Sequence, residues 1–398
     1  MFSRLRDRKI LSSFEKIRLR SKTTFSIDPD ISIARTPPGS FYRPSDETTF
    51  TSQCIKIFKD PSTWLYAPET LLARNKGDAV PFSTLPSSHY SEPLVAVKDM
   101  NDVTRVMSNV CTHRGKILVE EPHSILSNGK PMLRCGYHGR RFSGDGRCIG
   151  APGFDSIDHS IDDLPTASLH IVRGTLPFVS LQRQQQEQEQ EDFNNSFGDL
   201  FERLSFLPMN ELRPDPFTNS FTVKCHWSLY VENYLEGLHV PFVHPSLNNA
   251  LTMSQYKTEL FRNSSLQIGP AALTDDDNVL LPSSSQDNRV VAYYAWLFPN
   301  LMLNFYHWGC SINVVVPLGP SLTRIDYSRL VWGKGKGPQS NSKPSAGDNL
   351  DDVEKEDDAV VESVQKGIGA SLYTRGRYSE KWEKGTHHFH RLLLSRLN

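Results

Sequence analysis

Two histidines and a glutamate lie close together in segment 227–244, WSLYVENYLEGLHVPFVH. Glu236 and His239 are three residues apart, which would place both side chains on one face of a helix. Pro241 tends to end or kink that helix, so the chain can bring His244 back toward His239. Two neutral imidazoles and one carboxylate form a common ligand set for non-haem Fe(II). A partly buried helix with two incidental histidines is the alternative interpretation of this segment.

A second group of metal-type residues lies upstream, in two short turns. Cys111-Thr-His113 and Cys135-Gly-Tyr-His138 are separated by 21 residues. Two thiolates and two imidazoles can hold one Zn²⁺ or a [2Fe–2S] cluster. Zinc sites more often pair Cys with Cys and His with His along the sequence. Because each turn here offers one Cys and one His, the pattern favours a Rieske cluster over zinc.

The composition is that of an ordinary globular chain. Its 398 residues are enough for two domains with substantial cores, and 38% of them are hydrophobic. A net charge of −1 gives no reason to expect nucleic acid or an anionic membrane as a partner. No apolar run approaches the roughly 18 residues that a membrane span needs. Six cysteines are too sparse for a disulfide scaffold and fit a reducing compartment, so the four outside the two turns are expected to be ordinary thiols.

Local patterns divide the chain into segments that would position these groups. Residues 25–60 are Pro-rich and then helix-like, and we expect them to pack on the C-terminal domain. Residues 61–181 contain short β segments with frequent turn signals and predict a small all-β domain. Residues 182–196 are polar and of low complexity, which predicts a linker or insertion. Residues 197–398 mix helices and strands, so the whole chain is predicted to be α+β. The expected C-terminal elements are strands at 290–298, 301–306, 311–317 and 323–332, a loop at 333–347, and helices at 351–372 and 378–397.

The first 24 residues differ in composition from the rest. They carry eight basic and two acidic side chains, with Ser and Leu between them. Such a segment is typical of an organellar transit peptide, and a disordered basic tail is the alternative. We therefore expect a plastid or mitochondrial protein if the segment is a targeting signal, and a soluble cytoplasmic protein otherwise.

Together, the two motifs resemble those of the Rieske non-haem iron oxygenases, in their catalytic α-subunit (ring-hydroxylating) form. The likeness runs from about residue 25 to the C-terminus, apart from the insertions near residues 182 and 333. The resemblance implies a second domain of helix-grip type, with an antiparallel sheet around a mononuclear iron. The wording of residues 232–244 is most similar to choline and carnitine monooxygenases.

The resemblance also implies roles for individual residues. Asp357 matches the third iron ligand of the family, Asp358 is the alternative, and a solvated acidic helix face is the competing interpretation. Glu236 would carry electrons between the cluster of one subunit and the iron of its neighbour, and Asn233 matches a polar position near the iron. The implied ligands are Cys111, His113, Cys135 and His138 for the [2Fe–2S] cluster, and His239, His244 and Asp357 for the mononuclear iron.

The implied activity is hydroxylation of a small organic substrate with O₂, by mono- or dioxygenation. The chain has no G-x-G-x-x-G fingerprint, so electrons are expected from a separate ferredoxin or flavin reductase. The family's usual assembly implies a homotrimer. Aromatic residues at 293–308 could surround a quaternary amine such as choline, bury an aromatic ring, or be plain core. The alternatives are an aromatic-ring dioxygenase, a Rieske electron carrier without oxygenase activity, and a zinc-stabilised binding protein.

Two features depart from the family or carry no implied role. After His138 the chain reads Gly-Arg-Arg, where the family usually has Gly-Trp, and we expect Arg140 to alter the surroundings of the cluster. The spacer between the two turns is also long, and residues 124–130 are predicted to absorb the excess as a hairpin tip. The three histidines of the last helix, His387, His388 and His390, are expected to be surface or capping groups rather than ligands.

Overall fold

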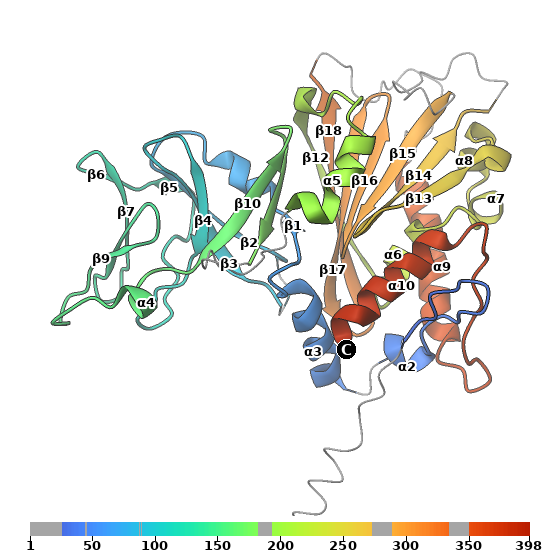
Figure 1. The fold of residues 1–398 in the computed structure, drawn as a ribbon, viewed down its shortest axis with the longest axis horizontal. Helices are drawn as coiled ribbons and strands as arrows, with labels where there is room; N and C mark the ends of the chain where they lie inside the picture. Colours follow the sequence, from blue (N-terminus) through green and yellow to red (C-terminus); the bar gives the residue numbers. More distant parts are fainter. Residues whose placement is uncertain are drawn as a thin grey trace, which may run out of the picture.

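The computed structural model describes residues 26–43, 46–86, 88, 90–181, 193–272, 289–333 and 350–398. Within these ranges the chain forms an all-β lobe and a larger lobe in which helices lie against an antiparallel sheet (Figure 1). This is the α+β architecture that the sequence predicts. The basic tail at 1–24, residues 182–192 of the expected linker and residues 334–347 of the expected loop lie outside the described ranges. None of the helices described is long and apolar enough to cross a membrane.

The β lobe is built on a seven-stranded antiparallel sheet with the order β1–β11–β10–β4–β3–β2–β5. Successive side chains of a strand point to opposite faces, and both faces of the sheet are covered. Val95 and Val97 pack into the core that also holds Cys111 and Cys135, whereas Leu94 belongs to a core on the other face. The strands are β1 (Leu65–Tyr66), β2 (Asp78–Ser83), β3 (Pro93–Lys98), β4 (Thr104–Ser108), β5 (His123–Ser124), β10 (Thr166–Val172) and β11 (Leu176–Ser180).

A smaller four-stranded sheet completes this lobe and carries one of the two Cys-His turns. Its tip is the β6–β7 hairpin, where Asn128 and Gly129 both have positive φ, as a tight two-residue turn requires. The hairpin expected at 124–130 is therefore confirmed. The first Cys-His turn lies between β4 and β5, and the second connects β7 to β8. The elements are β6 (Leu126–Ser127), β7 (Lys130–Arg134), β8 (Arg141–Ser143), β9 (Cys148–Gly150) and the short helix α4 (His159–Asp162).

The larger lobe contains a second seven-stranded antiparallel sheet, with the order β12–β18–β17–β16–β15–β14–β13. The four strands predicted between residues 290 and 332 are confirmed. Leu301, Leu303 and Phe305 of β16 face one core, so the residues between them point to the opposite face. The strands are β12 (Leu212–Val223), β13 (Lys257–Leu260), β14 (Ser264–Pro270), β15 (Val290–Leu297), β16 (Leu301–Tyr306), β17 (Gly309–Gly319) and β18 (Leu322–Trp332).

Helices lie against this sheet and bring distant parts of the chain together (Figure 1). Trp227 packs edge-on against Phe389 of the last helix at 5.9 Å, and Phe389 against Trp296 of the sheet at 5.4 Å. The two late helices are shorter than expected. The first ends at Gly367 instead of residue 372, and the second begins at Lys384 instead of residue 378. The helices are α2 (Gly39–Tyr42), α3 (Glu47–Phe58), α5 (Phe193–Arg203), α6 (Trp227–Tyr234), α7 (Val240–Val243), α8 (Pro245–Ala250), α9 (Leu350–Gly367) and α10 (Lys384–Leu397), with 3₁₀ turns η1 (Pro68–Leu72), η2 (Met209–Glu211) and η3 (Met253–Gln255).

The expectation that the histidines of α10 lie at the surface is wrong for two of them. His390 is fully buried, with Nδ1 2.6 Å from the Tyr378 hydroxyl and Nε2 2.9 Å from Glu232 Oε1. His387 is also buried, and its Nε2 donates to the backbone oxygen of Asp28 at 2.8 Å. Both imidazoles therefore join the last helix to other segments. Sequence periodicity could not show this, because buried hydrogen-bond partners come from distant positions.

Candidate metal centres

The segment between α6 and α7 gathers the residues of the first candidate centre. Helix α6 ends at Tyr234, so Glu236 and His239 lie on a turn and not on the helix face that we expected. The Glu236 carboxylate organises this turn by accepting the backbone N–H groups of Leu238 and His239. Pro241 lies in the first turn of α7, where a missing N–H costs nothing, so it begins a helix instead of ending one.

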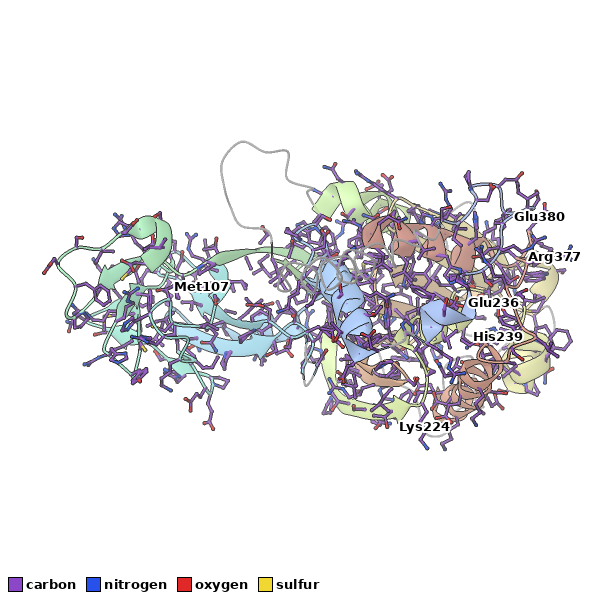
Figure 2. All side chains as sticks on the ribbon, turned by 90° about the horizontal axis from the view of Figure 1, so that it is seen from below. Met107, Lys224, Glu236, His239, Arg377 and Glu380 are labelled. Atoms are coloured by element: carbon purple, nitrogen blue, oxygen red, sulfur yellow. The ribbon has the colours of Figure 1, made fainter. Side chains whose placement is uncertain are left out.

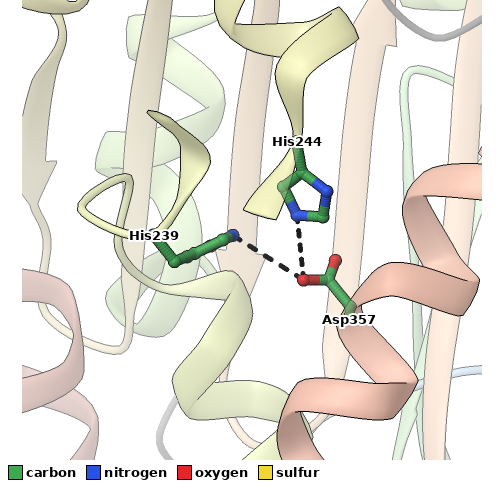
Figure 3. Close-up of side chains that lie close together, drawn as sticks. All are labelled: His239, His244 and Asp357. Carbon is green, nitrogen blue, oxygen red and sulfur yellow. Dashed lines mark hydrogen bonds and ion pairs between the residues drawn. The ribbon is translucent and has the colours of Figure 1, made fainter. Parts of the chain in front are cut away.

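This turn brings His239 and His244 to Asp357 of α9, as Figure 3 shows. Asp357 Oδ1 lies 3.0 Å from His244 Nε2 and 3.7 Å from His239 Nε2. One ligand atom from each residue lies within 4.8 Å of the others, and within the described ranges no other group of three or more His, Cys, Asp or Glu side chains does so. Two imidazole nitrogens and one carboxylate oxygen around one point are the donor set that Fe(II) accepts in facial-triad sites.

Each imidazole is oriented by a carboxylate of its own. His239 Nδ1 lies 2.7 Å from Glu236 Oε1, and His244 Nδ1 lies 2.6 Å from Glu356 Oε2. A proton on each Nδ1 leaves the Nε2 lone pairs free to face the common point. Burial lowers the pKa of His244, but the hydrogen bonds and charges of Asp357 and Glu356 outweigh burial and raise that pKa above its usual value.

Two residues beside Asp357, Asn233 and Asp358, differ in how they relate to the pair of histidines. Asn233 Nδ2 donates to Asp357 Oδ1 at 2.6 Å, so the amide predicted near the iron holds the carboxylate oxygen that faces both histidines. Asp358 is not part of this group, and burial, followed by the charges of Asp357 and Glu362, raises its pKa to about 6. The structure thus places Asp357, and not its neighbour, against the two histidines.

A cavity of about 120 Å³ opens beside these three residues. Of the aromatic residues considered at 293–308, only Tyr294 and Tyr306 line it, with ring centroids 6.1 Å apart and planes at 80°. Tyr293 and Phe305 point into the core on the other face of the sheet, as strand alternation requires. The cavity is lined by Tyr230, Asn233, Tyr234, Glu236, His239, Val240, His244, Leu247, Leu251, Tyr256, Gln267, Tyr294, Met302, Asn304, Tyr306, Asn313, Val353, Glu354 and Asp357.

Polar groups on the cavity wall hold one another in place. The Tyr234 hydroxyl donates to Asn304 Oδ1 at 2.7 Å, and the Tyr256 hydroxyl donates to Gln267 Oε1 at 3.1 Å. Burial raises the pKa of both tyrosines well above the usual value, so their hydroxyls stay protonated at neutral pH. These two tyrosines therefore add no charge to the cavity wall.

The second candidate centre consists of the two Cys-His turns, which have the same backbone geometry. In each turn the Cys N–H donates at 2.8 Å to the carbonyl five residues later, of Lys116 or Arg140. In each turn the Cys carbonyl also accepts the N–H of the glycine four residues later, at 3.0 and 3.1 Å. Gly115 and Gly139 have φ of 72° and 73°, a left-handed conformation that favours glycine. The two turns thus form a matched pair.

In space the turns bring Cys near Cys and His near His. Cys111 and Cys135 are both buried, and each thiol influences the pKa of the other. The His113 and His138 rings are 4.7 Å apart and lie closer to the surface. Burial raises the pKa of Cys111, whereas the N–H groups of Tyr137 and His138 lower that of Cys135 despite burial. This sorting into a thiol pair and an imidazole pair fits a Rieske cluster, in which two Cys bind one iron and two His bind the other.

Comparison with known proteins finds a matching family for each part of the chain that carries a candidate centre. Residues 76–166 match the Rieske [2Fe-2S] domain, and residues 211–398 match the ring hydroxylating alpha subunit (catalytic domain). The chain belongs to the Rieske non-haem iron oxygenases, as a catalytic α subunit. It is an oxidoreductase whose cofactors are a Rieske [2Fe–2S] cluster and a mononuclear iron. Enzymes of this family act on a substrate with O₂ and take electrons from a separate reductase or ferredoxin.

Its relatives include enzymes named for small quaternary ammonium compounds. The chain is 28% identical to the chloroplastic choline monooxygenase of Arabidopsis thaliana, over 94% of this chain and 86% of that protein. It is 25% identical to the carnitine monooxygenase oxygenase subunit of Escherichia coli K12, over 90% of this chain and 93% of that one.

Solved structures share the fold at lower identity. The quaternary ammonium Rieske monooxygenase CntA, in complex with L-carnitine, aligns with a TM-score of 0.66 at 19% identity and covers 93% of this chain and 97% of its own. Naphthalene 1,2-dioxygenase from Rhodococcus sp. aligns with a TM-score of 0.65 at 14% identity, over 91% of this chain and 94% of its own. At these identities the likeness establishes the fold alone.

The structure also reveals groups that sequence reasoning missed. Glu356 was hidden within an acidic run, although it lies directly before Asp357. Glu354 lines the cavity from the same helix and accepts the Asn313 side-chain amide at 3.2 Å. Helical spacing could have identified Glu354, because it lies three residues before Asp357 and therefore on the same face.

Proposed function

We propose that this chain is the oxygenase subunit of a monooxygenase for a small quaternary ammonium compound such as choline. The observation that carries the proposal is the charge of the cavity beside His239, His244 and Asp357. Its wall includes three carboxylates, of Glu236, Glu354 and Asp357, and the described residues that line it include no Lys or Arg. Fe(II) held by Asp357 would offset two of these three negative charges, so one net negative charge would remain to favour a cation, whereas a substrate carboxylate would find no Lys or Arg partner there.

The aromatic wall supports the same substrate class. A quaternary ammonium group donates no hydrogen bond, so it is recognised by the faces of aromatic rings. Tyr294 and Tyr306 meet at nearly a right angle beside the cavity, and Tyr234 and Tyr256 also line it. The related choline and carnitine monooxygenases carry names that indicate substrates of this type. A purely aromatic substrate would bring no positive charge to match the carboxylates of the wall.

We further propose the ligand assignments that the sequence predicted. In this proposal Cys111, His113, Cys135 and His138 hold the cluster, and His239, His244 and Asp357 hold the iron. When bound, the iron would supply O₂ activation, and the cluster would supply single electrons. Other side chains orient the proposed iron ligands. Glu236 and Glu356 keep the protons of His239 and His244 on Nδ1, and Asn233 holds the Asp357 oxygen in place.

The homotrimer and the bridging role of Glu236 remain part of the proposal. The Cys-His turns belong to the β lobe and the three proposed iron ligands to the other lobe, so electrons within one chain would cross the whole molecule (Figure 1). Figure 2 labels Met107, on the strand before the first turn, in one lobe, and Glu236 and His239 in the other. Tyr137, within the second cluster turn, and Phe242, in α7 beside the iron site, are exposed large side chains. Contact between such surfaces of neighbouring subunits would shorten the electron path.

Organellar targeting and the domain boundaries are also proposals. The plant relatives are named as chloroplastic, and residues 1–24 have the basic composition of a transit peptide. Import into isolated plastids with loss of a short N-terminal piece would support targeting. We keep the proposed domains at 25–60, 61–181 and 197–398, although α5 already begins at Phe193, inside the expected linker.

The proposal is tested first by metal content and then by turnover. Three irons and two acid-labile sulfides per chain, with a Rieske electron paramagnetic resonance signal after reduction, are expected. Two irons that cannot be increased by added Fe(II) would indicate an electron carrier, and zinc without sulfide would refute both centres. With a ferredoxin and its reductase, choline should be oxidised with uptake of O₂. Preferential turnover of naphthalene would instead establish the aromatic dioxygenase.

A further inference from the structure

Arg140 is a buried cation that joins the segments around the two cluster turns. It stands where the family usually has Trp, and only 3% of it is exposed. Its Nη1 donates to Asp162 Oδ1 at 2.7 Å and to Thr112 Oγ1 at 3.0 Å. Thr112 lies between Cys111 and His113, so the guanidinium of the second turn is bonded directly to the first turn.

Asp162, the acidic partner of Arg140, is hydrogen-bonded to Thr112 as well. The Thr112 hydroxyl donates to the backbone oxygen of Asp162 at 2.8 Å. The other carboxylate oxygen of Asp162 accepts the N–H of Asp158 at 2.9 Å. That N–H and the Arg140 guanidinium lower the pKa of Asp162 despite burial, so the carboxylate is ionised at neutral pH. Arg140 and Asp162 therefore form a buried ion pair that crosses from the second turn to α4.

An aromatic side chain links the same cation to His113. The Arg140 guanidinium lies over the Phe154 ring, 5.0 Å from its centroid. Phe154 meets the His113 ring edge-on, with centroids 5.3 Å apart and an interplanar angle of 89°. Arg140 thus acts on the first turn from two sides, through Thr112 and through Phe154.

We infer that Arg140 is a positioning residue that locks the two cluster turns together and that its buried charge raises the midpoint potential of the cluster. The inference rests on the proposed cluster ligands. Reduction by one electron from the reductase adds one negative charge between the turns, and a fixed cation in a poorly solvated site stabilises that charge. Asp162 opposes the effect. The guanidinium contacts the first turn directly, however, whereas the Asp162 carboxylate points to Arg140 and Asp158.

Four variants of the cluster-loaded full-length protein separate charge from geometry. Arg140→Met removes the charge and the hydrogen bonds, and Arg140→Lys keeps the charge but loses the planar fork. The double variant Arg140→Met with Asp162→Asn removes both charges of the pair. Arg114→Gln is the matched control, because Arg114 adjoins His113 in sequence but is exposed, so that water and salt screen its charge.

The measurement is a spectroelectrochemical titration of the Rieske absorption. We expect Arg140→Met to have a clearly lower midpoint potential than the wild type and Arg140→Lys to stay close to it. The double variant should lie between the wild type and Arg140→Met, and Arg114→Gln should shift less than any variant that loses the Arg140 charge. A wild-type potential in loaded Arg140→Met would overturn the inference, as would an equal shift in Arg114→Gln.

Loss of the cluster from Arg140→Met would support the locking role. The effect of the charge on the midpoint potential would in that case be tested with the double variant. A wild-type potential in the double variant would then overturn the electrostatic role. Failure of the wild type to show any Rieske signal after iron and sulfide reconstitution is a different result. It would refute the proposed cluster ligands rather than the role of Arg140.

Discussion

His244 Nδ1 lies 2.6 Å from Oε2 of Glu356, the residue directly before Asp357. Helix α9 therefore acts twice on the same imidazole: Glu356 holds Nδ1, while the next residue faces Nε2 at 3.0 Å. The His244 side chain is 1% exposed and Glu356 is 40% exposed, so the ring is fixed from the solvent side by a carboxylate. Metal-binding histidines commonly need such a partner to keep the ring in one orientation and one tautomer.

Replacement of Glu356 by Gln should weaken binding of the mononuclear iron by about 10- to 100-fold, the usual effect of losing such a partner. An amide is a poorer acceptor for Nδ1–H and lets the His244 ring turn. The measurement is an anaerobic Fe(II) titration of protein that already contains its cluster. Glu380→Gln, an exposed change also in the C-terminal part of the chain, is the control and should bind iron like the wild type. Equal affinity in both variants would contradict the orienting role.

Asp357→Ala should abolish the mononuclear iron and leave the Rieske spectrum unchanged. Its Oδ1 is the oxygen that faces both histidines and is held by Asn233. Asp358→Asn is the matched comparison on the neighbouring residue, and we expect it to keep at least most of its iron. Iron analysis before and after chelation would distinguish the two. Full iron occupancy in Asp357→Ala would place the third ligand elsewhere.

Sequence reasoning located the ligand candidates because their spacing is local. Cys111 with His113, and His239 with His244, are each set by a short turn, so residue types alone indicate what they can bind. The same reasoning was wrong about local geometry. It placed Glu236 on a helix, but helix α6 ends at Tyr234, and Glu236 accepts two N–H groups of its own turn.

Contacts between distant segments were beyond the reach of sequence patterns. Asp357 could be selected only by family resemblance, since its neighbours Glu356 and Asp358 are chemically equivalent in an acidic run. His390 was expected to be a surface or capping group, but it is buried, and Tyr378 and Glu232 provide the hydrogen-bond partners that a buried imidazole needs. Such choices depend on what packs opposite a helix, and the pattern of one helix does not contain that information.

His226 should make the folded protein sensitive to mild acid. It is buried against Phe41 and Phe50 at the start of α6, and burial lowers its pKa to about 3. The unfolded chain takes up this proton near pH 6.5 and the folded chain does not, so the full stability is present above that pH. As the pH falls from about 6.5 toward 3, this one group costs up to about 1.4 kcal/mol per pH unit.

The comparison is between wild type and His226→Asn, since Asn also caps a helix N-terminus through its side chain. Urea unfolding of both proteins at pH 7.5 and pH 5.5 gives the loss of stability on acidification. The wild type should lose about 1.4 kcal/mol more than the variant over this interval. Because the variant also leaves space in the core, the difference between the two pH values, and not the absolute stability, is the readout. The same pH dependence in both proteins would mean that folding does not lower the pKa of His226.

Glu354→Gln should raise the KM for choline about tenfold, equivalent to roughly 1.4 kcal/mol of lost binding. The change removes one negative charge from the cavity wall but keeps a side-chain oxygen that can accept the Asn313 amide, now 3.2 Å from Glu354 Oε1. A neutral isostere, 3,3-dimethylbutanol, has the same shape without the charge, so its KM should stay unchanged. L-Carnitine brings its own carboxylate and should gain relative to choline in the variant. Equal effects on choline and the neutral alcohol would show that Glu354 shapes the cavity without recognising a cation.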